Sequence, residues 1–110
     1  MEIVPELAES ARSRLVALGF LNVSMRQGDG HRGWPEAAPF DGILVTAAPE
    51  QIPDVLLYQL RPGGRLIAPL GPATDAQELV LVRKGDNGAN RYEELLPVRF
   101  VPMTGESDLP

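Results

Sequence analysis

The stretch "QGDGHRGWPEAAPFDGILVTAAP", residues 27–49, places an acidic glycine-flanked loop just ahead of a dense apolar segment. Residues 40–48 predict a strand, and the consecutive apolar residues 43–45 are typical of a strand that is covered on both faces. Such strands belong to parallel sheets with helices on either side. The predicted strand ends on three small residues, Thr46, Ala47 and Ala48.

On the amino-terminal side of this stretch, residues 5–18 predict a helix. Pro5 suits its first position, because the N–H that proline lacks has no partner there. Leucine and alanine recur at helical spacing to give one apolar stripe, and Gly19 follows as a C-terminal cap. Residues 2–4 and 22–26 are expected to be short strands.

On the carboxyl-terminal side, the pattern predicts a helix, a strand and a β-hairpin. "RPGG" at residues 61–64 is expected to stop the helix, and Pro97 indicates an edge or a bulge in the last strand. The alternation of strands and helices predicts an α/β fold with a mostly parallel sheet and a C-terminal β-hairpin. The expected ranges are 51–60 for the helix, 65–71 for the strand, and 78–84 with 91–100 for the hairpin.

Composition excludes several classes of function. The formal net charge of −5 argues against a nucleic-acid-binding protein. Without cysteine and with one histidine, the chain is expected to hold no metal site and no disulfide. No signal peptide is visible, and no apolar stretch approaches the ~20 residues of a membrane span. We therefore expect a cytoplasmic protein of one domain that binds neither nucleic acid nor membrane.

Ligands of α/β folds bind beyond the carboxyl ends of the strands, and two acidic residues fall there. Glu2 could accept two hydrogen bonds from a ribose diol, or it could be a solvated charge near the chain start. Asp29, between Gly28 and Gly30, could accept from an adenine amino group, or the three residues could form an ordinary turn.

The small strand end at residues 46–48 suits a small reacting group, although, taken alone, such residues more often reflect plain packing. His31 is expected to be a loop residue. Since no serine, histidine and acid stand at a defensible spacing, nucleophilic catalysis is rejected, and no catalytic residue is assigned.

Four segments taken in order resemble bacterial protein-L-isoaspartate O-methyltransferases. They are "EIVPELAESARSRL", the stretch from "QGDGHRGWPEAAPFDGILVTAAP" on to "PGGRLIAPLG", "QELVLVRK" and "LLPVRFVPMTG". The resemblance implies a partial Rossmann-like S-adenosylmethionine-dependent methyltransferase fold, and isoaspartyl-containing proteins or peptides as substrates. It places the cofactor S-adenosyl-L-methionine at Glu2, Ile3, Asp29, Gly30 and Thr104, and the isoaspartyl peptide at Thr46, Ala47, Ala48, Val101 and Pro102.

The chain departs from the family pattern at its start. The family's first strand, its glycine-rich cofactor loop and its active-site serine have no counterpart here. Residues 1–105 are therefore interpreted as the C-terminal portion of the methyltransferase domain, with residues 106–110 as a tail. Three explanations remain: a fragment of a longer enzyme, which we favour, an inactive remnant or interaction module, or a chain that works with a second chain. On its own the chain is expected to be inactive.

Overall fold

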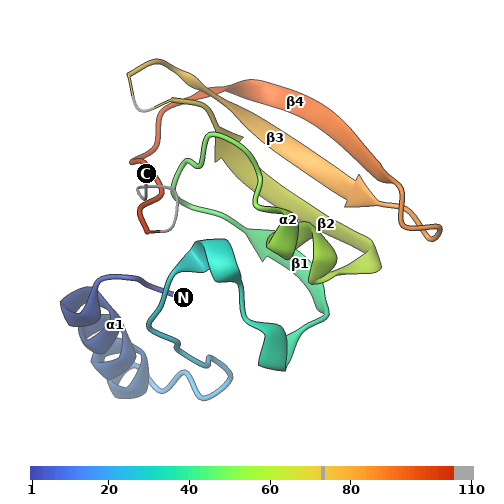
Figure 1. Ribbon diagram of the computed structural model, residues 1–110. Helices are drawn as coiled ribbons and strands as arrows, with labels where there is room; N and C mark the ends of the chain where they lie inside the picture. The colour runs from blue at the N-terminus through green and yellow to red at the C-terminus, as the bar shows by residue number, and fades with distance from the viewer. Residues whose placement is uncertain (73, 106–110) are drawn as a thin grey trace. The chain divides into compact units, whose positions relative to one another are not determined.

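The computed structural model describes residues 1–72 and 74–105, which fall into two compact units. The first unit is Met1–Gly30 together with the chain from Thr104 onward, and the second is His31–Met103. Figure 1 shows the helices and strands of both units. The boundary expected at residue 105 stays a prediction, because the tail at residues 106–110 lies outside the described residues.

The first unit is built on helix α1, Pro5–Ala17, which confirms the predicted helix to within one residue. Pro5 stands at its first position, and Gly19 (φ +82°) follows its end. The apolar stripe is only partly covered, however, with Ala11 and Leu15 half-buried. Leu7 and Leu18 are 56% and 65% exposed, and Ala8 is the buried residue of the helix. Helical periodicity reports a common face, and whether that face is covered depends on neighbouring elements.

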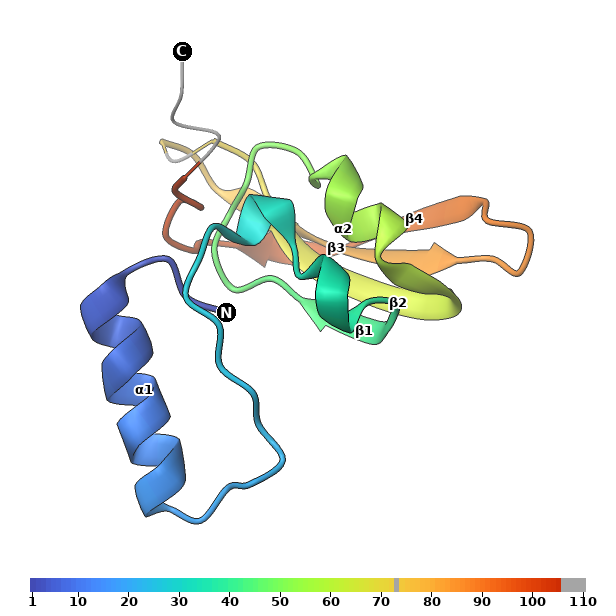
Figure 2. The same ribbon diagram turned by 60° about the horizontal axis from the view of Figure 1, so that its bottom comes forward.

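After α1 the chain turns and runs back toward its own start (Figure 2). Glu2 and Gln27 form an isolated parallel bridge, in which the Glu2 N–H donates to the Arg26 carbonyl at 3.0 Å and the Gly28 N–H donates to the Glu2 carbonyl at 2.9 Å. The strand predicted at 22–26 is not formed, and the pairing is limited to the single bridge at Gln27, just beyond that range.

The second unit holds a four-stranded sheet, counted over the described residues, in the order β1-β2-β3-β4. Figure 1 shows α2 lying against β2 in this unit. Two short 3₁₀ turns, η1 and η2, precede the first strand. The bounds are η1 Gly30–Arg32, η2 Pro35–Ala37, β1 Phe40–Leu44, α2 Asp54–Tyr58, β2 Leu60–Leu70, β3 Gln77–Lys84 and β4 Asn90–Val98.

The partial Rossmann-like α/β architecture is confirmed, but the sheet is mixed where a mostly parallel one was predicted. β1 pairs with β2 in parallel, whereas β2 with β3 and β3 with β4 are antiparallel. The connections explain the difference: a parallel neighbour needs a crossover, which the chain between β1 and β2 supplies with α2, while β3 and β4 are joined by a tight hairpin. The predicted hairpin is confirmed. Pro97 lies on edge strand β4 beside a register shift, as expected.

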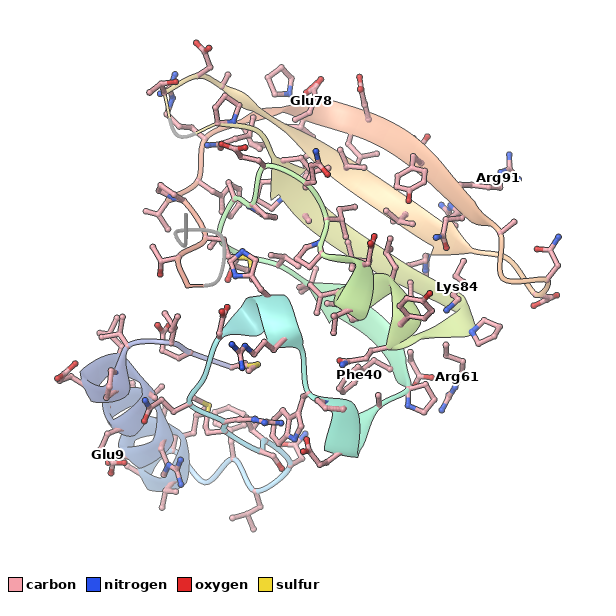
Figure 3. The ribbon with its side chains drawn as sticks, in the orientation of Figure 1. Glu9, Phe40, Arg61, Glu78, Lys84 and Arg91 are labelled. Atoms are coloured by element: carbon pink, nitrogen blue, oxygen red, sulfur yellow. The ribbon has the colours of Figure 1, made fainter. Side chains whose placement is uncertain are left out.

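The "RPGG" segment was expected to stop the helix, but it lies within β2. Helix α2 ends at Tyr58 and β2 begins at Leu60, before Arg61. Between the partners Phe40–Leu60 and Gly42–Arg65, residues 61–64 loop out opposite Asp41. A Cβ on Gly64 would lie 2.9 Å from the Asp41 carbonyl oxygen, so only glycine allows this approach. The Arg61 guanidinium forms an ion pair with the Asp41 carboxylate; Figure 3 labels Arg61 and the neighbouring Phe40.

The core of the second unit lies between α2 and the sheet. Its centre is β2, where Leu66 and Ala68 are 0% exposed. Leu44, expected to be covered on both faces, is instead 76% exposed, because β1 is an edge strand of this sheet. Among the described residues, none of the helices combines the length and the apolar character needed to cross a membrane. The buried core residues are Leu56, Leu60, Leu66, Ala68, Val80 and Val82.

Candidate functional site

In the first unit, one carboxylate lies at the bridge of Glu2 with Gln27 and another, that of Asp29, lies two residues after it. The Glu2 side chain is half-buried, and its Oε1 accepts a hydrogen bond from the Val4 N–H at 3.1 Å. This bond holds the carboxylate at the start of α1. Asp29 comes two residues after the bridge and is also half-buried. The parallel bridge therefore brings Glu2 close to the glycine loop that carries Asp29.

Asp29 also lies against the returning chain at residues 104–105. Gly105 has φ +120°, and a Cβ on it would stand 2.6 Å from the Asp29 carboxylate. Thr104, the preceding residue, is exposed. The first unit thus contains all the predicted cofactor residues. Glu2 lies beside Gly28, and Asp29 lies beside Gly105. Gly30 follows Asp29 directly, and Ile3, which follows Glu2, is half-buried.

These residues fit the nucleoside part of an S-adenosyl cofactor. Ionised carboxylates offer only acceptor oxygens, which suits a ribose diol and an exocyclic amino group, both of which donate. The backbone at Gly28 is open to close approach, since a Cβ there would meet no backbone atom and only the flexible end of Met1 at 3.3 Å. The sequence named these positions together but could not distinguish a binding site from a turn, and their role in cofactor binding stays a prediction.

In the second unit, the small residues after β1 pair with the segment after β4. The Ala48 N–H donates to the Val101 carbonyl at 2.7 Å, and the Met103 N–H donates to the Ala48 carbonyl at 2.9 Å. Ala48 and Pro102 form the resulting parallel bridge. Proline is tolerated at this point because the bridge uses the backbone groups of its two neighbours, so the N–H that Pro102 lacks is not needed.

We call residues 46–48 and 101–102 the acceptor segments. Ala48 is buried, whereas Thr46 and Val101 are exposed. The predicted strand over residues 40–48 ends at Leu44, and the chain continues extended, with the Val45 N–H donating to the Ile67 carbonyl at 2.9 Å. The five predicted peptide-binding residues are therefore brought together by backbone pairing rather than by side chains.

A cavity of about 370 Å³ lies elsewhere in the second unit, beside α2. None of the predicted site residues lines it. Its walls include Lys84, which is labelled in Figure 3. The Lys84 ammonium group donates to the carbonyls of Leu57 and Leu60 at 2.9 and 2.8 Å. These bonds satisfy carbonyls at the end of α2, so we read this as a structural region. The lining residues are Asp54, Leu57, Tyr58, Lys84, Gly88 and Asn90.

Two buried glutamines were missed by the sequence analysis. Gln59 and Gln77 are 8% and 2% exposed, and the carboxamide of each forms hydrogen bonds with backbone groups of another segment. No periodicity distinguishes a buried glutamine from a surface one. The only signal for Gln77 was its position just ahead of the apolar run at residues 79–82.

The fold is the partial Rossmann-like fold of S-adenosylmethionine-dependent methyltransferases. The family model described as "Protein-L-isoaspartate(D-aspartate) O-methyltransferase (PCMT)" matches residues 1–108. The chain belongs to this family.

Curated relatives match nearly the whole chain. It is 54% identical over 105 residues to the protein-L-isoaspartate O-methyltransferase 2 of Syntrophobacter fumaroxidans, covering 96% of this chain and 42% of that protein. It is 54% identical over 108 residues to the Myxococcus xanthus protein-L-isoaspartate O-methyltransferase, covering 96% and 51%. The chain thus spans about half the length of the curated relatives it matches.

Solved structures agree on the fold. A protein-L-isoaspartate O-methyltransferase superposes with a TM-score of 0.87 at 32% identity, covering 94% of this chain and 33% of that one. A Plasmodium falciparum protein in complex with S-adenosyl-L-homocysteine superposes with a TM-score of 0.80 at 22% identity, covering 94% and 50%. The latter likeness concerns the fold alone.

Proposed function

We propose that this chain supplies the nucleoside contacts and the peptide-acceptor segments of a protein-L-isoaspartate O-methyltransferase. Such an enzyme transfers a methyl group from S-adenosyl-L-methionine to the free carboxyl of L-isoaspartyl residues in damaged proteins. Family membership over residues 1–108 supports the proposal. The structural observation that carries it is the parallel bridge of Glu2 with Gln27, which brings Glu2 close to the loop that carries Asp29.

The chemistry explains why no catalytic dyad is needed. When bound, S-adenosyl-L-methionine supplies an electrophilic methyl group on a sulfonium. A carboxyl group has an ordinary pKa near ~4, so the isoaspartyl substrate is already an ionised nucleophile at neutral pH. The protein's task is then to orient two reactants and to keep water away from them.

The residues divide this task between them. Glu2 accepts from the ribose, Asp29 accepts from the adenine amino group, and Ile3, Gly30 and Thr104 border the nucleoside. Thr46, Ala47 and Ala48 face the isoaspartyl peptide from one side, and the backbone of Val101 and Pro102 extends the same surface. Their bridge at Ala48 keeps these segments in a fixed register.

A second role has one observation in its favour. Leu44 is 76% exposed at the end of edge strand β1, and an open apolar edge can pair with a strand of another chain. In this alternative the chain is an interaction module or the partner of a second chain that completes the domain. We place either form in the cytoplasm.

The test uses a chimera in which the part of the Myxococcus xanthus relative outside the 108 matched residues is joined to this chain. The chimera should methylate an isoaspartyl peptide. Glu2→Gln should weaken its affinity for S-adenosyl-L-homocysteine by about tenfold, as expected for loss of one charged acceptor. Glu6→Gln is the matched control, because Glu6 is exposed on α1. A folded chimera with equal affinities for all three forms would refute the assignment of Glu2.

A further inference from the structure

Gln77 begins β3, and its side chain is buried. Its backbone pairs with Val98, the last residue of β4. Two residues beyond Val98, the side-chain carboxamide of Gln77 forms the next pair of bonds. Its Oε1 accepts from the Phe100 N–H at 2.6 Å, and its Nε2 donates to the Phe100 carbonyl at 3.2 Å. An amide side chain offers one acceptor and two donors, so it can present the same pair of bonds that a further backbone residue would. The Gln77 side chain therefore prolongs the β3–β4 ladder beyond β4.

The segment held in this way is the one that pairs with Ala48. Along an extended chain, successive residues direct their backbone groups to opposite edges. Phe100 accordingly bonds to Gln77, while the Val101 carbonyl and the Met103 N–H bond to Ala48. The segment that contains Val101 and Pro102 is thus held from both edges.

The loop after β2 closes over the same glutamine. Gly71 has φ +143°, and a Cβ on it would lie 3.2 Å from the Cα and Cγ of Gln77. The Gly71 N–H donates to the Pro49 carbonyl at 3.1 Å, one residue after Ala48. Nε2 of Gln77 makes a longer contact of 3.5 Å with the Pro72 carbonyl. Gln77 is therefore enclosed by two segments: the loop that follows β2 and the chain that follows β4.

We propose that Gln77 is a positioning residue for the isoaspartyl peptide. Its carboxamide sets where residues 101–102 begin relative to residues 46–48, and it touches neither the substrate nor the cofactor. The substrate part of this proposal rests on the proposed function, whereas the positioning itself is a property of this chain.

The first experiment uses the 110-residue chain. Gln77→Met preserves length and apolar volume but leaves the N–H and carbonyl of Phe100 without these partners. Amide hydrogen exchange at Phe100, Ala48 and Met103 should accelerate by about tenfold, as expected for the loss of buried backbone bonds.

The matched control is Gln59→Met. Gln59 is also buried, and its Oε1 accepts from the Trp34 N–H at 2.9 Å, in a segment apart from residues 100–103. This variant should accelerate exchange at Trp34 and leave Phe100, Ala48 and Met103 unchanged. Equal acceleration of those three amides by both variants, or none with Gln77→Met, would overturn the proposal.

The second experiment measures kinetics in the chimera. Gln77→Met should raise KM for an isoaspartyl peptide by about tenfold while the Kd for S-adenosyl-L-homocysteine is unchanged. Gln77→Glu, which keeps the acceptor for the Phe100 N–H but loses the donor, should be intermediate. An unchanged KM despite accelerated exchange would limit Gln77 to a structural role. If the folded, unsubstituted chimera transfers no methyl group, the proposed function fails, and the exchange results alone decide the positioning role.

Discussion

Gly105 lies so close to Asp29 that a single added methyl group would stand 2.6 Å from the Asp29 carboxylate carbon and from both of its oxygens. A real Cβ does not approach another atom so closely. The contact joins the loop after the Glu2–Gln27 bridge to the residue that follows Thr104. The absence of a side chain at Gly105 thus leaves room for the Asp29 carboxylate, which we propose binds the adenine amino group.

Gly105→Ala should therefore displace Asp29 and weaken nucleoside binding. We expect the affinity of the chimera for S-adenosyl-L-homocysteine, measured by calorimetry, to fall by about tenfold or more, since a displaced carboxylate loses its charged hydrogen bond. Gly19→Ala is the control: Gly19 also has a positive φ, of +82°, but a Cβ there meets nothing within 4 Å. Equal losses in both variants would indicate backbone strain rather than the contact with Asp29.

The chain on its own should bind S-adenosyl-L-homocysteine very weakly and transfer no methyl group. It spans 42% to 51% of the relatives described above, and the cofactor residues assigned here reach only the nucleoside. Calorimetry and a methyl-transfer assay with an isoaspartyl peptide would check this. Micromolar affinity or turnover by the 110-residue chain contradicts the prediction, and rescue by a separate fragment carrying the rest of the family domain would support the two-chain form.

Lys84→Met should lower the free energy of unfolding of the second unit by about 1–3 kcal/mol, because it removes two charge-assisted bonds to the carbonyls of Leu57 and Leu60. Urea unfolding followed by circular dichroism measures this. Arg83→Met is the control, since Arg83 is the preceding β3 residue and is exposed; its effect should stay within about 0.5 kcal/mol. Similar losses for both variants would mean that the Lys84 bonds contribute little.

Leu44→Lys should reduce self-association without lowering stability. Leu44 is 76% exposed on an edge strand, and a charged residue there opposes edge-to-edge pairing. Sedimentation and urea unfolding would give the two quantities. As a contrast, Leu66→Ala, at a fully buried position of β2, should cost about 2–5 kcal/mol. Strong destabilisation by Leu44→Lys would show that this side chain is covered in solution.

Local sequence signals were sufficient for several elements. Pro5 and Gly19 bracket α1, and the turn before Asn90 together with Pro97 marks the hairpin and its edge strand. In each case the deciding interaction is within a few residues along the chain: a proline without an N–H, a glycine at positive φ, or a tight turn. The rule that ligands gather at strand ends also led to Glu2 and Asp29; the structure brings Glu2 close to the loop that carries Asp29, and their binding role stays a prediction.

Tertiary structure alone decided burial, pairing and register. The apolar residues around Leu7 and Leu44 follow the same sequence patterns as residues that are buried. Both side chains are nevertheless exposed, because exposure depends on which other elements pack against them. Residues 61–64 proved to be a looped-out part of β2 because of their fit against Asp41. The role of Gln77 required knowing that Phe100, far along the chain, ends beside it. The sequence by itself thus determined most of the local elements and the family. Contacts between distant segments determined how the candidate site is held. The free energy of those contacts depends on residues far apart in the chain, which a local sequence pattern does not identify.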